Sequence, residues 1–188
     1  MIGSYFRERF RPTLFAPVAA SIALGAAGGA FHPLRVAADA CFAALLLAEF
    51  RLWDDLADRR TDALTHPARV LVKTQSVRPL IVLCGVLFAL NLVICVAMAG
   101  GHVSLTAFVT LHAALGVRYA VRSRRTIAGD QLLLAKYPAF VVIVAGARML
   151  DASLPIASAA LATYAAASVY EAWHDPASPV AALLGGRS

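Results

Sequence analysis

Long uncharged apolar runs alternate with short charged segments along this chain. Each run has about twenty residues, the length that a helix needs to cross a bilayer. The runs cover approximately residues 13–31, 34–53, 79–99, 103–121, 132–150 and 154–173. Prolines and glycine pairs lie between several of them, where one helix ends and the next begins. The pattern predicts an all-α integral membrane bundle of about six transmembrane helices.

Composition supports this prediction. Of the 188 residues, 60% are hydrophobic and only 15% are charged, which is far from the balance of a soluble domain. The length fits one domain, residues 1–188. The first run follows Arg7, Arg9 and Arg11 as a secretory signal would, but it is too long for the apolar part of one. We therefore expect a retained first transmembrane helix.

The positive residues predict an orientation. Along a six-helix path most arginines and lysines fall on one side, and only Arg35 and Arg148 fall clearly on the other. Positive residues mark the cytoplasmic side, so we expect both termini in the cytoplasm. This distribution accounts for the net charge of +6 without a nucleic-acid partner. The expected location is a bacterial inner (cytoplasmic) membrane.

The longest charged segment, WDDLADRRTDALTHPARVL, follows the second apolar run. Its Asp55, Asp58 and Asp62 are three and four residues apart, so a helix would place them on one face. Like charges on one face repel unless a cation lies between them. Carboxylates at this density suit Mg²⁺, which shares its shell with substrate phosphates. The following Arg69 and Lys73 are suited to binding the same phosphates.

A second acidic group follows from the topology. The sixth run must return to the side of the first acidic segment, and it ends in Glu171 and Asp175, four residues apart. A basic loop after the fourth run, Arg122, Arg124 and Arg125, faces the same side. Two acidic groups and a basic loop around one opening suit a metal–diphosphate site.

The run D-D-x-x-D-x-x-x-D followed by H-P-x-R-x-L resembles the first aspartate-rich motif of the UbiA superfamily of intramembrane prenyltransferases. Asp54 takes the place of the usual Asn, and Val70 takes the place of a Pro. Glu171 and Asp175 resemble the second acidic motif, and residues 119–125 resemble the basic loop that contacts diphosphate. The positions that match the first motif are Asp55, Asp58, Asp62, His66, Pro67, Arg69 and Leu71.

The resemblance implies a Mg²⁺-dependent transfer of an isoprenoid group from a prenyl diphosphate to an aromatic or other lipid-soluble acceptor. It implies catalytic roles for Asp55, Asp58, Asp62, Glu171 and Asp175, and metal coordination by these five residues and Asp54. Diphosphate contacts fall to Arg69, Lys73, Arg122, Arg124 and Arg125. The chain resembles a six-helix form without the superfamily's usual last three helices. A second copy or a membrane protein partner is therefore expected to complete the lipid pocket.

Three other functions remain open. A non-catalytic integral subunit of a larger complex fits the six-helix form. A CDP-alcohol phosphotransferase would also be a small Mg²⁺ enzyme of the membrane, but its motif requires Gly where Asp55 follows Asp54. A transporter is less favoured, because transport sites usually lie near the midplane of the bilayer.

Several single residues also carry predictions. We expect Asp39 to pair with Arg35, one turn away, and Arg148 to pair with Asp151. Lys136 is expected to extend its amine to the membrane surface.

His112 stands alone on an apolar run and is expected to be a satisfied core histidine. Trp53, Tyr119, Tyr170 and Trp173 fit an interfacial aromatic belt.

Overall fold

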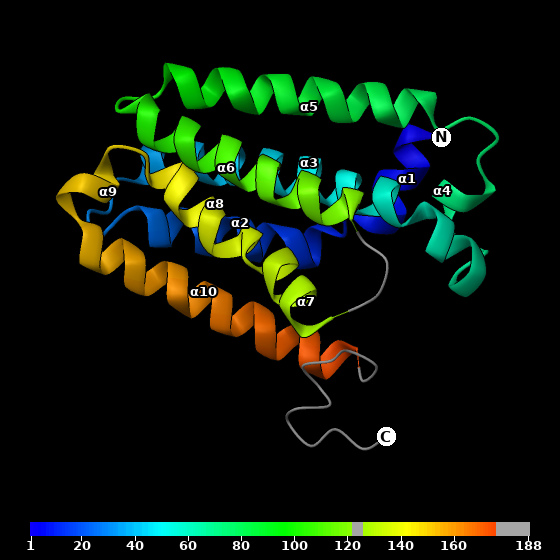
Figure 1. The fold of residues 1–188 in the computed structure, drawn as a ribbon. Coiled ribbons are helices and arrows are strands. Elements are labelled where there is room, and N and C mark those ends of the chain that lie inside the picture. The colour runs from blue at the N-terminus through cyan, green and yellow to red at the C-terminus, as the bar shows by residue number, and fades with distance from the viewer. Residues whose placement is uncertain (122–125, 176–188) are drawn as a thin grey trace.

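The computed structural model describes residues 1–121 and 126–175. These residues form helices and contain no strand, which confirms the all-α prediction. The longer helices lie side by side in one bundle (Figure 1). The helices are α1 (Ile2–Arg9), α2 (Pro12–Ala26), α3 (Pro33–Thr65), α4 (Val70–Lys73), α5 (Arg78–Ala97), α6 (Gly101–Ala120), α7 (Ile127–Leu134), α8 (Lys136–Ala145), α9 (Arg148–Asp151) and α10 (Ser153–His174).

Four segments of the described chain are long and apolar enough to cross a membrane. They are α5, α6, α7 with α8, and α10. Helix α2 is apolar but has only 15 residues. Helix α3 carries Asp39, Glu49 and Arg51 within its apolar half. The protein is therefore a membrane protein by its helices, whereas the count of six spans remains a prediction.

Prolines start three of the long helices. Pro12, Pro33 and Pro79 lie in the first positions of α2, α3 and α5. A proline is tolerated there because the N–H groups of the first turn have no partner within the helix. The chain breaks predicted around these residues are thus present in the structure.

The predicted fifth helix is divided. Its segment starts earlier than expected, at Ile127, where the hydroxyl oxygen of Thr126 accepts a hydrogen bond of 3.1 Å from the Gly129 N–H. It breaks at Ala135, between α7 and α8, where Pro138 cannot donate to the preceding turn. Gly146, with φ of 57°, then ends α8.

The four aspartates of the acidic segment all lie on one helix. We expected a helix to end near Trp53, but α3 continues for 33 residues to Thr65. At 1.5 Å per residue its length is about 50 Å, well beyond the hydrocarbon thickness of about 30 Å. The last turns of α3 therefore carry the aspartates beyond the apolar half of the same helix.

The core lies around the middle of α3. Phe50 is fully buried and its ring contacts those of Phe108 on α6 and Phe140 on α8, with centroids 6.4 and 5.0 Å apart. A smaller apolar cluster around Leu52 and Leu80 joins α3 to α5 and to the short helices α1 and α4. Helix α3 is thus covered on two sides.

An ion pair joins α3 to α9. Arg148 Nη1 donates to Asp39 Oδ2 over 2.7 Å. The expected pairs of Asp39 with Arg35, and of Arg148 with Asp151, are wrong, because an interhelical partner is closer than the neighbours on the same helix. Arg148 also donates to the carbonyls of Val144 and Ala145.

One end of the bundle collects the charged segments. Helices α1 and α4, the last turns of α3 and the C-terminal end of α10 all lie at this end (Figure 1). Helix α9 and the connection between α5 and α6 lie at the other end. The two acidic groups are therefore at the same end of the described fold.

Candidate functional site

Asp55 is the best-anchored aspartate of the acidic segment. It is buried, and Tyr5 Oη donates to its Oδ2 over 2.8 Å. Arg9 binds both carboxylate oxygens, with Nε–Oδ2 at 2.9 Å and Nη2–Oδ1 at 2.6 Å. Arg51 Nη2 lies 3.3 Å from Oδ1, one turn earlier on α3. The hydrogen bonds of Asp55 described here therefore come from α1, and its second cationic partner lies on its own helix.

Burial, together with the contact to Asp55, keeps Tyr5 neutral. Burial raises the pKa of Tyr5 far above its usual range, and the charge of Asp55 raises it further. A neutral phenol can donate to the carboxylate, so Tyr5 helps to hold α1 on α3. Arg9, one of the arginines before the first apolar run, likewise binds α1 to α3 through Asp55. The sequence did not predict this contact.

Asp54 faces another part of the bundle. Tyr119 Oη donates to its Oδ1, and Lys136 Nζ donates to its Oδ2. Lys136 is buried, so the prediction that its amine extends to the surface is wrong. An ammonium group buried beside a carboxylate avoids the cost of an unpaired charge.

The remaining residues of the first motif lie toward the end of α3. Asp62 pairs with Arg69 at 2.5 Å, which closes the connection from α3 to α4. Asp58 is half-buried between Asp55 and Asp62 and also has an interaction partner. Lys73 is exposed at the end of α4.

A pocket of about 810 Å³ opens between α1, α2, α3, α8 and α10. Its charged part is formed by Arg9, Arg11 and Arg51, with Glu8 and Glu171. Its apolar part is lined mainly by Leu14, Phe15, Val18, Leu47, Leu134 and alanines of α10. We call it the arginine pocket. It combines three arginines and two glutamates with apolar walls, so it offers both charged and apolar contacts to a ligand.

Arg51, which lines the arginine pocket, has one hydrogen-bond donor without a partner. Its Nε is buried and has no hydrogen-bond partner, although its Nη2 contacts Asp55. A buried donor without a partner costs about 1–3 kcal/mol.

The second acidic group is brought partly to this pocket. Glu171 lines the arginine pocket near the end of α10. Asp175 follows the helix and is half-buried, and both residues have interaction partners. The predicted diphosphate ligands Arg122, Arg124 and Arg125 lie outside the described residues.

Asp54, Asp55 and Asp62 do not fit a Mg²⁺ site as they stand. The oxygens of Asp55 are held by a phenol and two guanidinium groups, and Asp54 and Asp62 each bind a cationic side chain. Among the described residues there is no group of three or more His, Cys, Asp or Glu side chains that could hold a metal. A metal would have to displace arginine or lysine from these positions.

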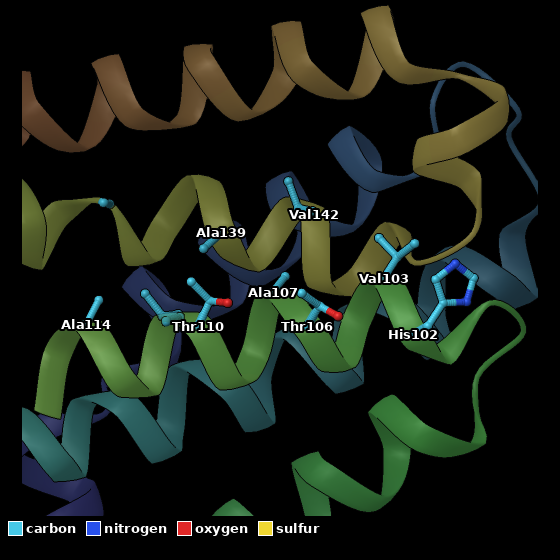
Figure 2. A pocket seen from close by; sticks show the side chains of 10 residues that line it. His102, Val103, Thr106, Ala107, Thr110, Ala114, Ala139 and Val142 are labelled. Atoms are coloured by element: carbon cyan, nitrogen blue, oxygen red, sulfur yellow. The ribbon is translucent and has the colours of Figure 1, made fainter.

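A second, more open pocket of about 650 Å³ lies between α6 and α8 (Figure 2). Ala107, Thr110, Ala139 and Val142 line its middle, and His102 lies at one end. Its apolar and hydroxyl lining suits hydrocarbon contact rather than diphosphate binding.

Sequence reasoning also missed a buried polar network in the apolar half of the bundle. His112 Nε2 lies 2.7 Å from Glu49 Oε1, and Asn91 Nδ2 donates to Glu49 Oε2 over 2.6 Å. His112 is a satisfied core histidine, as predicted, and its partner is the carboxyl group of Glu49. Glu49 lies in an otherwise apolar stretch, three residues after Leu46. An ionisable residue in such a place is a signal of function.

No family model, curated protein or solved structure matches this chain. The resemblance to the UbiA superfamily therefore remains a prediction based on the two acidic motifs and the basic loop.

Proposed function

We propose that this protein binds a prenyl diphosphate in the arginine pocket and transfers its prenyl group to a lipid-soluble acceptor. The observation that carries the proposal is the pocket itself, whose lining joins three arginines to apolar walls. The UbiA-like motifs supply the reaction class.

Recognition of the two parts of the substrate follows from the lining. Guanidinium groups bind phosphate oxygens through paired, charge-assisted hydrogen bonds, and Arg51 Nε is an unfilled donor. Asp55 holds Arg9 and Arg51 in the wall of the pocket. The prenyl tail lies against Phe15, Val18 and similar side chains, where its burial contributes about 25 cal/mol per Å² of apolar surface.

The transfer consists of one bond broken and one formed. The allylic carbon–oxygen bond breaks, and the electron pair stays with the departing diphosphate. The arginines stabilise the charge that develops on this leaving group, because such donors act most strongly where water is excluded. A nucleophilic atom of the acceptor bonds to the allylic carbon and releases its proton to a carboxylate of the pocket wall, Glu8 or Glu171.

Mg²⁺ takes no part in the steps described. The resemblance implies a Mg²⁺ requirement, which remains a prediction, whereas Asp54, Asp55 and Asp62 are occupied by cationic side chains.

The same occupation of the aspartates favours a second candidate function. A non-catalytic membrane subunit that binds a diphosphate lipid would use the arginine pocket without transferring the prenyl group.

Binding of a non-hydrolysable prenyl thiodiphosphate to the purified protein in detergent tests the proposal. We expect Arg51→Gln to weaken binding about 10-fold or more, because a charge-assisted hydrogen bond contributes about 1.5–3 kcal/mol. Arg35→Gln, an exposed change at the other end of α3, is the matched control. Equal affinities for the two variants would contradict the proposed site.

Two further arms separate binding from catalysis. Binding that survives EDTA indicates recognition by arginines, and binding lost in EDTA indicates carboxylate–metal recognition. The resemblance makes Asp58 a metal ligand, so a Mg²⁺-dependent transfer to aromatic acceptors predicts that Asp58→Asn abolishes transfer but not membrane insertion. Binding without transfer by the wild-type protein would favour the non-catalytic subunit.

A further inference from the structure

Glu49, Asn91 and His112 form a polar network that the proposed prenyl transfer does not use. They come from α3, α5 and α6. Glu49 is 1% exposed and Asn91 is 0% exposed, so the network has almost no contact with solvent. Glu49 also lies on a different face of α3 from Leu47 and Arg51, which line the arginine pocket.

The hydrogen bonds of His112 restrict where its protons are. Its Nδ1 lies 2.9 Å from the carbonyl oxygen of Phe108, and its Nε2 lies 2.7 Å from Glu49 Oε1. A carbonyl oxygen only accepts hydrogen bonds, so Nδ1 carries a proton. The contact at Nε2 then needs one more proton, either on the imidazole or on the carboxyl group.

Both placements of this proton give the same net charge. An imidazolium with a carboxylate, and a neutral imidazole with a carboxylic acid, are each neutral overall. Without the shared proton, a buried carboxylate would face the lone pair of Nε2, and a net negative charge would remain in the apolar region. Burial of an uncompensated charge is strongly unfavourable.

Within residues 1–121 and 126–175, no other cation is paired with Glu49. After Arg78 at its start, the ionisable side chains of α5 are the thiols of Cys84 and Cys95. On α3, Arg51 is directed at Asp55. On α8, Lys136 is held by Asp54. The shared proton is therefore the charge that balances this carboxylate.

Aromatic rings enclose the imidazole. The rings of Phe108, Phe50 and Phe88 have centroids 4.1, 4.6 and 5.0 Å from that of His112. Trp53 stacks on it at 5.2 Å with an interplanar angle of 13°. Ring faces attract a cation, so this cage favours retention of the proton. Asn91 Oδ1, which is buried and has no partner, leaves one acceptor open beside the network.

We propose that Glu49 and His112 form a proton-binding site in the apolar half of the bundle, independent of the arginine pocket. Its ligand is one proton shared between the carboxyl group and the imidazole, and Asn91 orients the carboxyl group.

Nitrogen-15 NMR of histidine-labelled protein in detergent micelles at neutral pH, with infrared spectroscopy, tests this site. His112→Phe assigns the His112 signals. We expect both ring nitrogens to be protonated, or one to be protonated together with a carboxylic acid band. That band would be lost in Glu49→Gln and unchanged in the exposed control Asp151→Asn. Carbon-13 labelling of glutamate would shift the band in the wild-type protein, so the test does not depend on the folding of the variant.

A pair without the shared proton would give different spectra. A His112 ring with one bare nitrogen, together with an infrared spectrum that has no glutamic acid band, would show a deprotonated pair and overturn the site. Thiodiphosphate binding is expected to be unchanged in Glu49→Gln, which separates this site from the arginine pocket.

Discussion

At the scale of single residues, Asp55 shows what a motif position contacts in the fold. The resemblance implies a metal ligand, which remains a prediction, and in the structure the carboxylate binds two arginines and a tyrosine. The spacing of Arg51 and Asp55 is i,i+4, which predicts a pair on one helix. The contribution of Arg9 was not predictable, because it depends on how α1 packs against α3.

Tyr5 gives a prediction for pH. Its pKa is raised by burial in the folded protein, whereas an unfolded tyrosine has a pKa near 10. The folded state therefore keeps a proton that the unfolded state loses above about pH 10. Stability is fully present below that pH and falls above it by about 1.4 kcal/mol per pH unit.

Tyr5→Phe should remove this part of the alkaline slope. Denaturant unfolding in detergent micelles from pH 9 to pH 11 measures it, with the exposed Tyr170→Phe as the control. The same slope in wild type and Tyr5→Phe would mean that Tyr5 ionises normally in the folded state.

At the scale of elements, the apolar runs predicted most of the long helices but not their ends. The runs report burial and membrane contact, so a charged extension such as the last turns of α3 gives no apolar signal. The division of α7 from α8 was signalled by Pro138, a position that the pattern of apolar residues ignores. Interhelical pairs such as Asp39 with Arg148 depend on packing angles that no single run contains.

The connection between α5 and α6 supplies a prediction of backbone strain. Gly100 has φ of 67°, and an added Cβ would lie 2.4 Å from Ala147 Cβ and 2.8 Å from its Cα. Gly29 has φ of 93° and open space around it. Both substitutions by Ala incur a left-handed penalty of about 1–2 kcal/mol, but only Gly100→Ala also forces two backbones apart.

We expect Gly100→Ala to lower the free energy of unfolding by about 1–3 kcal/mol more than Gly29→Ala. Thermal unfolding of the two variants in the same detergent provides the comparison. Equal losses would show that α6 and the loop before α9 are not in close contact.

At the scale of the whole molecule, the sequence predicted a helical membrane protein with its acidic groups at one end. The helix class and the shared end are present in the structure, because they follow from hydrophobicity and from the number of chain reversals. The side of the membrane that this end faces depends on the bilayer and is still a prediction from the positive residues.

Cysteine labelling tests the orientation. In a background without Cys41, Cys84 and Cys95, single cysteines at the exposed positions Ala63 and His174 should react with an impermeant maleimide only after cells are opened. A cysteine at the exposed Ser153 should react in intact cells. Labelling of 63 and 174 from opposite sides would exclude a common mouth, and labelling of both from outside would reverse only the orientation.

The pairs of Asp39 with Arg148 and of Asp54 with Lys136 have a joint mechanical consequence. They join α3 to the antiparallel α7–α9 segment at two levels, about 22 Å apart along α3 at 1.5 Å per residue. Apolar side chains in lipid lose little when helices slide past each other. A slip of one turn would separate both pairs together, so these two bonds set the axial register of α3.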